Sequence, residues 1–156
     1  MKKFTTLAFM AVLMVVILSV SGAHAFDREH WLKFVLTHSC PGCDLSYVDI
    51  RWQEHVGANL QGANLTGAQL TETNLEKANL SGANLSLAIM RKTKLNNANL
   101  QGANLTSAIA QEAWFMNANL KGANLTNTHL EAAILIGAIW TDGATCKDHS
   151  IDKCVK

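Results

Sequence analysis

Four cysteines are the first candidates for redox or metal chemistry in this chain, and they form two local pairs in the sequence. Cys40 and Cys43 enclose a Pro-Gly dipeptide, whereas Cys146 and Cys154 lie near the carboxyl end. A Cys-x-x-Cys pair can tune its thiols for disulfide exchange, so redox activity is one hypothesis for Cys40 and Cys43. Haem attachment is not indicated, because that motif needs His after the second cysteine and Asp44 stands there.

Two histidines extend this set. His38 together with Cys40 and Cys43 would offer three zinc ligands, but no fourth ligand is evident. His55 lies beside Glu54 and would be a candidate site if buried; the alternative is a polar residue tolerated in a frayed first turn of the fold. No nucleophile–base pattern, phosphate-binding glycine loop or paired catalytic carboxylate is present. We therefore expect no catalytic residues, no metal and no cofactor.

Most of the chain follows a five-residue repeat. This repeat must position the cysteines and histidines discussed above. An apolar residue, in most cases a large one, stands at every fifth position from Leu45 to Trp140, and His55 is the one residue among these twenty positions that is not apolar. A small residue, most often Ala, lies two positions earlier, from Cys43 to Ala138. Strands repeat every 2 residues and helices every 3.6. The period therefore indicates a coil in which the chain turns a corner at each repeat.

The blocks ANLQG, ANLTG and ANLSG, which begin at Ala58, Ala63 and Ala78, resemble the pentapeptide-repeat family, whose consensus is A(N/D)Lxx. The resemblance covers roughly residues 43–140. It implies an all-β solenoid: a right-handed quadrilateral β-helix with four repeats per coil and about five coils in this chain. The central and small residues would point inward, and residues twenty apart would stack. One expected core column is Leu45, Leu65, Leu85, Leu105 and Leu125.

Both ends of such a solenoid need caps, because each end exposes unpaired backbone and apolar core. We expect a short N-terminal capping helix within residues 26–39. Asp27 can cap its first turn, and Trp31, Phe34, Val35 and His38 follow at helical spacing. Residues 141–156 are expected to form a C-terminal capping tail.

The implied coil also restricts the disulfides. Coils stack about 4.8 Å apart, so the two cysteine pairs would lie at opposite ends of the solenoid. A disulfide needs Cα atoms within about 7 Å. The resemblance therefore implies the pairings Cys40–Cys43 and Cys146–Cys154, with each bond closing one cap.

Residues 1–25 are typical of a secretory signal peptide. Lys2 and Lys3 precede an apolar run, and Ala23 and Ala25 supply the small residues before a cleavage site. An uncleaved membrane anchor is the alternative. We expect an exported protein, periplasmic or extracellular, with no membrane contact after cleavage. Cleavage would remove Lys2 and Lys3 from the thirteen Lys and Arg, leaving eleven basic residues against twelve Asp and Glu. The resulting net charge of about −1 disfavours nucleic-acid binding.

The outward positions are mostly polar. One column contains only hydroxyl residues, namely Ser46, Thr66, Ser86, Thr106 and Thr126, and a neighbouring column is mainly Asn. We expect these side chains to satisfy the corners of the coil and to solvate its wall. Binding of ordered water or ice by the hydroxyl column is the alternative.

A second group of outward positions is apolar instead. Trp114 and Ile134 share one column and Met116 and Ile136 another, which predicts an apolar patch on the third face of the last two coils. A partner protein or a second copy of the chain could bind there; the alternatives are that the tail from Thr141 covers it or that it stays bare. The candidate interface comprises Ile89, Ile109, Trp114, Met116, Ile134, Ile136 and Ile139.

Together these features predict a signal peptide (1–25), a helical cap (26–39), a β-helix (40–140) and a capping tail (141–156). The predicted function is that of an exported, non-enzymatic binding or structural module that acts through protein–protein contact. Some relatives of the family inhibit or shield DNA gyrase by imitating duplex DNA, but export and a near-zero net charge argue against that role. The alternative function is a thiol-disulfide protein that uses Cys40 and Cys43.

Overall fold

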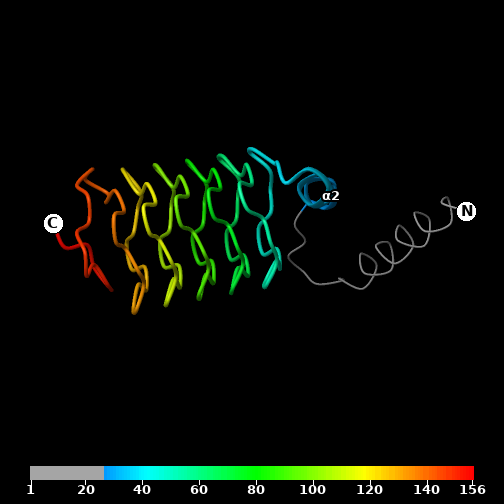
Figure 1. The fold of residues 1–156 in the computed structure, drawn as a ribbon. Helices are drawn as coiled ribbons and strands as arrows, with labels where there is room; N and C mark the ends of the chain where they lie inside the picture. Colours follow the sequence, from blue (N-terminus) through cyan, green and yellow to red (C-terminus); the bar gives the residue numbers. More distant parts are fainter. Residues whose placement is uncertain (1–26) are drawn as a thin grey trace, which may run out of the picture.

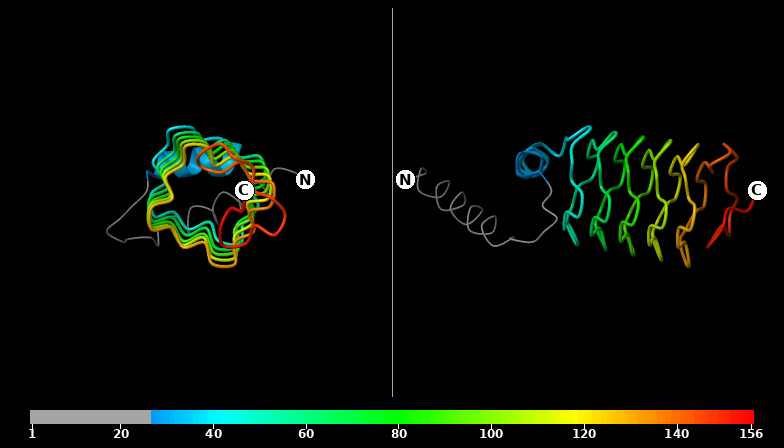
Figure 2. Two further views of the ribbon diagram at one scale, coloured as in Figure 1. Left: turned by 90° about the vertical axis from the view of Figure 1, so that its left-hand side faces the viewer. Right: turned by 180° about the vertical axis from the view of Figure 1, so that it is seen from behind.

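The computed structural model describes residues 27–156, so the predicted signal peptide lies outside the described residues. One helix, α2 (Arg28–Thr37), precedes a solenoid whose successive coils lie over one another. Seen along its axis the solenoid is four-sided, with α2 at one end and the carboxyl terminus at the other (Figures 1 and 2). No helix within residues 27–156 is long and apolar enough to cross a membrane.

Each repeat contributes one strand position and a two-residue corner. The strand positions pair in parallel with those twenty residues later, as in the series Asn64, Asn84 and Asn104. The amide of Leu65 donates to the carbonyl of Asn84 at 2.7 Å, and the amide of Asn84 donates to the carbonyl of Ala63 at 2.9 Å. Because the chain turns every five residues, these pairs are single bridges rather than long strands. Each coil thus depends on its neighbours for its backbone hydrogen bonds.

The corners place their second residue in the left-handed backbone region, which suits glycine. Gly67 has φ 66°, but Glu72 occupies the same place in the next repeat with φ 57°. Gly67 meets a second requirement, because the ring of Tyr47 lies over it. A Cβ at this position would come within 2.5 Å of Tyr47 Cε1.

The interior consists of the predicted Leu and Ala columns. Leu65, Leu85 and Leu105 are fully buried, one above another. In one coil the small Ala110 is followed by the large Phe115, and both are buried, which keeps that layer filled. Where Thr replaces the small inward residue, its hydroxyl forms a hydrogen bond. The Thr73 hydroxyl, for example, donates to the carbonyl of Ile50 at 2.8 Å.

The outward Asn and hydroxyl columns bond mainly to one another. Asn64 Oδ1 accepts from the Thr66 amide at 3.2 Å and from its hydroxyl at 2.7 Å. Asn104 accepts in the same way from Thr106. These hydroxyl protons are therefore used within the wall, which supports the structural role over the binding of ordered water.

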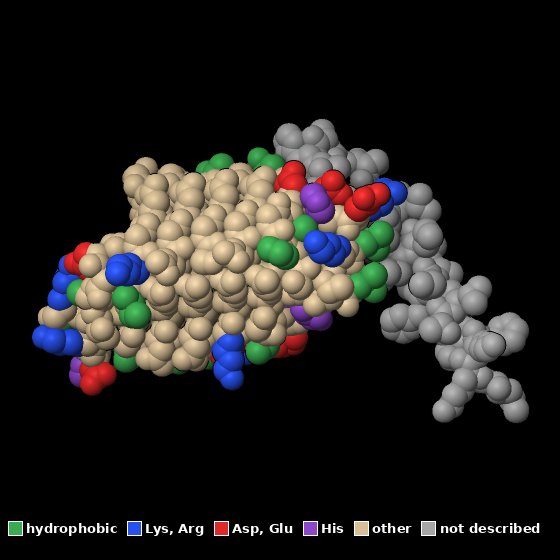
Figure 3. All heavy atoms as spheres, turned by 90° about the horizontal axis from the view of Figure 1, so that it is seen from above, with side chains coloured by type: hydrophobic (Ala, Val, Ile, Leu, Met, Phe, Trp, Pro, Cys, Tyr) green, Lys and Arg blue, Asp and Glu red, His purple; other side chains and the backbone are tan. Residues whose placement is uncertain are grey.

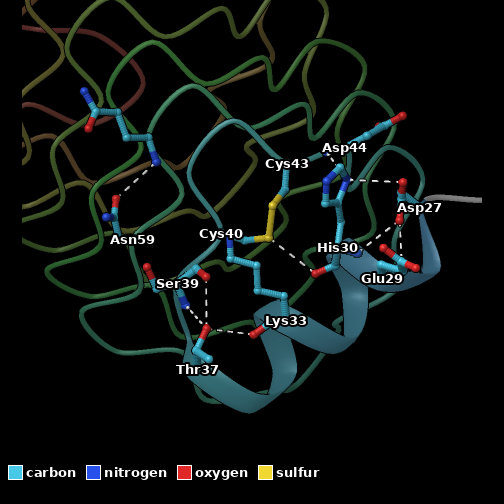
Figure 4. Close-up of a disulfide and its surroundings, with 11 residues drawn as sticks. Asp27, Glu29, His30, Lys33, Thr37, Ser39, Cys40, Cys43, Asp44 and Asn59 are labelled. Atoms are coloured by element: carbon cyan, nitrogen blue, oxygen red, sulfur yellow. Dashed lines mark hydrogen bonds and ion pairs between the residues drawn. A yellow bond between two sulfur atoms is a disulfide. The ribbon is translucent and has the colours of Figure 1, made fainter.

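At the N-terminal end, α2 lies across the first coil. Asp27 caps the helix by accepting from the amides of Glu29 and His30, and Phe34 is its one fully buried side chain. The Nδ1 atom of His30 accepts from the amide of Asp44 at 3.1 Å, and so it satisfies a backbone donor of the first coil (Figure 4).

At the other end the tail covers only half of the last coil. The Leu135 amide donates to the carbonyl of Ser150 at 2.8 Å, and Leu135 is fully buried beneath this segment. Leu125 and Leu130, on the two preceding sides, are only partly buried. The tail pairs antiparallel with Ile134 and Ile139, so the capping segment lies on these two sides and leaves the other two sides of the last coil less covered.

Candidate protein-interaction surface

The predicted apolar patch forms two short columns on one wall of the solenoid. Trp114 pairs with Ile134 in the next coil, and the amide that follows Met116 donates to the carbonyl of Ile136 at 3.0 Å. We call these four residues the third-face patch. The stacking brings together side chains that are twenty residues apart in sequence, in the columns that the period predicted.

Trp114 is the most exposed member of the third-face patch. Its side chain is 39 % exposed, whereas Met116, Ile134 and Ile136 are half-buried. Lys94, one coil earlier in the same column, holds its Nζ atom 5.9 Å from the centre of the indole ring. This cation–π contact orients the ring on the wall while leaving it accessible.

The tail borders the third-face patch but does not cover it. Its segment pairs with the edge of the last coil, through the antiparallel bridges Ile134–Ile151 and Ile139–Thr145. Ile136 lines a shallow open hollow together with Lys147 and His149 of the tail. Trp114 lies one coil away from this edge and remains exposed, so the tail does not explain its position on the surface.

The other predicted interface residues lie on the adjoining walls. Ile89 and Ile109 pair with each other on the second side, next to the corner that leads to Trp114, and Ile139 lies on the fourth side. Sequence reasoning missed Leu87, which is 57 % exposed in the corner before Ile89. The signal in the sequence was weak, because the same corner position holds Tyr, Gly, Glu and Lys in other repeats.

The face drawn in Figure 3 consists over most of its middle of backbone and neutral polar side chains. Its charged side chains lie near the two ends and along the lower edge of the view.

The four cysteines form the two expected disulfides, Cys40–Cys43 and Cys146–Cys154. Cys40 and Cys43 are both buried, and Cys40 Sγ lies 3.3 Å from the carbonyl oxygen of His30 in α2 (Figure 4). A disulfide without exposed sulfur is poorly placed for thiol exchange, and its sulfurs cannot serve as zinc ligands. No cluster of three His, Cys, Asp or Glu that could hold a metal ion occurs within residues 27–156.

His55 keeps its place in the core register instead of marking a frayed coil. It is 4 % exposed, and its ring centre lies 4.6 Å from that of Phe34 in α2. Its Nδ1 atom is 3.2 Å from Nδ1 of His38, and its Nε2 atom is 3.1 Å from Oε1 of Gln53. Burial and, to a lesser extent, the nearby His38 lower the pKa of His55 to about 4, with Glu54 opposing this shift.

Comparisons with known proteins agree with this geometry. The family model described as pentapeptide repeats matches residues 43–82, 56–91, 83–122 and 115–139, more than half of the chain. The structure of the pentapeptide repeat protein Rfr23, from the cyanobacterium Cyanothece 51142, is similar with a TM-score of 0.54 and 25% sequence identity. That similarity covers 72% of this chain and 97% of Rfr23.

HetL, a pentapeptide repeat protein involved in heterocyst differentiation regulation from the cyanobacterium Nostoc sp. Strain PCC 7120, is 32% identical over 69% of this chain, with a TM-score of 0.46. The chain covers 53% of HetL, or about half of its length. No match to a curated protein was found.

Proposed function

Because this chain belongs to the pentapeptide-repeat family, whose members form right-handed quadrilateral β-helices and are generally non-enzymatic, we propose that it is a binding or structural module. It acts by protein–protein contact, and the third-face patch is its contact surface. The module consists of about five coils between α2 as the N-terminal cap and the tail. Its partner is another protein or a second copy of the chain.

The observation that carries this proposal is the exposure of Trp114 on a regular wall, directly in line with Ile134 and beside Met116. Exposed aromatic residues amid aliphatic ones are typical of the centres of protein interfaces. The wall around them is rigid, because every coil is hydrogen-bonded to the next. A partner would therefore dock without ordering this surface first, which favours binding.

Export is the second part of the proposal. It rests on residues 1–25, with their basic start, apolar run and small residues at the end. The two disulfides support it, because such bonds persist mainly in oxidising compartments. The mass of the protein recovered from the periplasm or medium of a bacterial host tests this part: loss of residues 1–25 is expected, and retention of the full mass in the cytoplasm would contradict it.

The contact surface is tested by chemical cross-linking in the producing cells followed by purification. The double variant Trp114→Ser and Ile134→Ser should lose the cross-linked species that the unchanged protein forms. Trp52→Ser is the matched control, because Trp52 is 64 % exposed but lies in the first coil. Circular dichroism should show the same fold in all three proteins. Identical cross-linked species from all three would contradict the proposal.

A further inference from the structure

The two histidines at the N-terminal end form an arrangement that the contact function does not use. His55 stands in a core column otherwise filled by apolar residues, and its Nδ1 atom points at Nδ1 of His38 across 3.2 Å. His38 ends α2, adopts the left-handed conformation with φ 51° and is exposed. His38 is exposed and His55 is buried, so the two rings meet at the boundary between solvent and core.

The tautomer of His55 is set by Gln53. A carboxamide oxygen only accepts hydrogen bonds, so the contact of 3.1 Å between Gln53 Oε1 and His55 Nε2 places the ring proton on Nε2. The Nδ1 atom of His55 then accepts a hydrogen bond from Nδ1 of His38, and the His38 proton has to move to its Nε2 atom before both Nδ1 lone pairs can face an ion. Metal-binding histidines are held in this way, with the distal nitrogen donating to an oxygen so that the other nitrogen is free to ligate.

We propose that His38 and His55 bind a divalent ion of the late first row, Zn²⁺, Ni²⁺ or Cu²⁺, between their Nδ1 atoms. Imidazole nitrogens bind zinc at about 2.0–2.1 Å, and two of them in tetrahedral geometry lie roughly 3.3 Å apart. The observed separation of 3.2 Å matches this spacing. The ring centres are 5.1 Å apart with the planes inclined by 54°, so both rings converge on the same region.

The remaining coordination positions belong to water or to a group from outside the chain. Cys40 and Cys43 supply no thiolate, because they are joined in a disulfide, so the site differs from the His-Cys-Cys set that the sequence suggested. Imidazole-only coordination suits these three ions better than Mg²⁺ or Ca²⁺, which prefer oxygen. A bound ion would fasten the end of α2 to the first coil.

Isothermal titration of the purified protein, first treated with EDTA and dialysed, tests the site with ZnCl₂ and with CuSO₄. One ion per chain should bind. His38→Asn should weaken binding at least tenfold without disturbing the backbone, because Asn tolerates the left-handed conformation. His149→Asn is the matched control: His149 is exposed with φ 69° and should leave the affinity unchanged.

Electron paramagnetic resonance of the Cu²⁺ complex gives an independent readout. Two imidazole nitrogens should couple to the copper in the unchanged protein, and His38→Asn should remove one of them. The proposal is overturned if no saturable binding occurs, or if His38→Asn and His149→Asn bind zinc and copper as tightly as the unchanged protein. The test uses His38→Asn because His38 is exposed and lies outside the packed core, so the variant is expected to fold.

Discussion

Leu65 and Leu85 lie in adjacent coils of one core column, both fully buried, with the Leu65 amide donating to the carbonyl of the residue before Leu85 at 2.7 Å. One coil of the solenoid therefore takes twenty residues, and a residue lies directly over the residue twenty positions earlier. This relationship makes the surface predictable as well, because outward side chains stack with the same spacing.

Leu85→Ala should lower the free energy of unfolding by about 2–5 kcal/mol, because it opens a cavity in a middle layer that cannot collapse freely. Leu125→Ala is the matched control in the same column at the half-covered end, where Leu125 is only partly buried. Its cost should be smaller. Urea denaturation followed by circular dichroism measures both, and equal losses would contradict the layered core.

His55 should make the protein sensitive to acid. Its pKa is about 4 in the folded protein against an ordinary value of 6.5, so the unfolded chain binds the proton more readily. The stabilising contribution of neutral His55 is complete above about pH 6.5 and is lost as the pH falls to about 4, which amounts to roughly 3 kcal/mol.

His55→Leu should remove most of this pH dependence, because Leu fills the column as in the neighbouring coils. Denaturation midpoints between pH 4 and pH 7, measured with EDTA present, check the prediction. A parallel loss of stability in both proteins would show that other groups cause the acid sensitivity.

Native, non-reduced protein should react with none of the thiol reagents that label free cysteine, because all four cysteines are paired. The buried Cys40–Cys43 bond should also resist mild reductant until the protein unfolds. Rapid reduction of this bond in folded protein would instead favour the thiol-disulfide function. A titration with Ellman's reagent before and after treatment with dithiothreitol measures both.

Gly67→Ala should destabilise the protein more than Gly82→Ala. Both positions have nearly the same backbone, with φ 66° and 65°, so both substitutions incur a strain of about 1–2 kcal/mol. Only at Gly67 would the new methyl group strike the ring of Tyr47. In a Tyr47→Ala background the two losses should become equal, and thermal denaturation of the four glycine variants and their two parent proteins shows whether they do.

Much of this structure could be predicted from the sequence because one period governs it. The five-residue spacing placed Leu65, Leu85 and Trp114 in their columns, and the coil that the resemblance implied led to both disulfides. The period says nothing about the ends, which lack the repeat. The half-covered layer at Leu125 depends on where the tail docks, and the approach of His38 to His55 depends on the angle of α2 across the first coil.

Leu87 was missed for a different reason. It occupies a corner position that tolerates many residue types, so one Leu there attracts no notice until its exposure is known. The third-face patch was predicted, in contrast, because the same kind of exception recurs in two consecutive coils.

Site-specific photocrosslinking tests the proposed contact surface most directly. A photoreactive phenylalanine derivative placed at Trp114 should yield a discrete adduct with a partner protein or a second copy of the chain, whereas the same group placed at Trp52 should yield none. Absence of any adduct from position 114, or the same adducts from both positions, would contradict the assignment of the third-face patch as the binding surface.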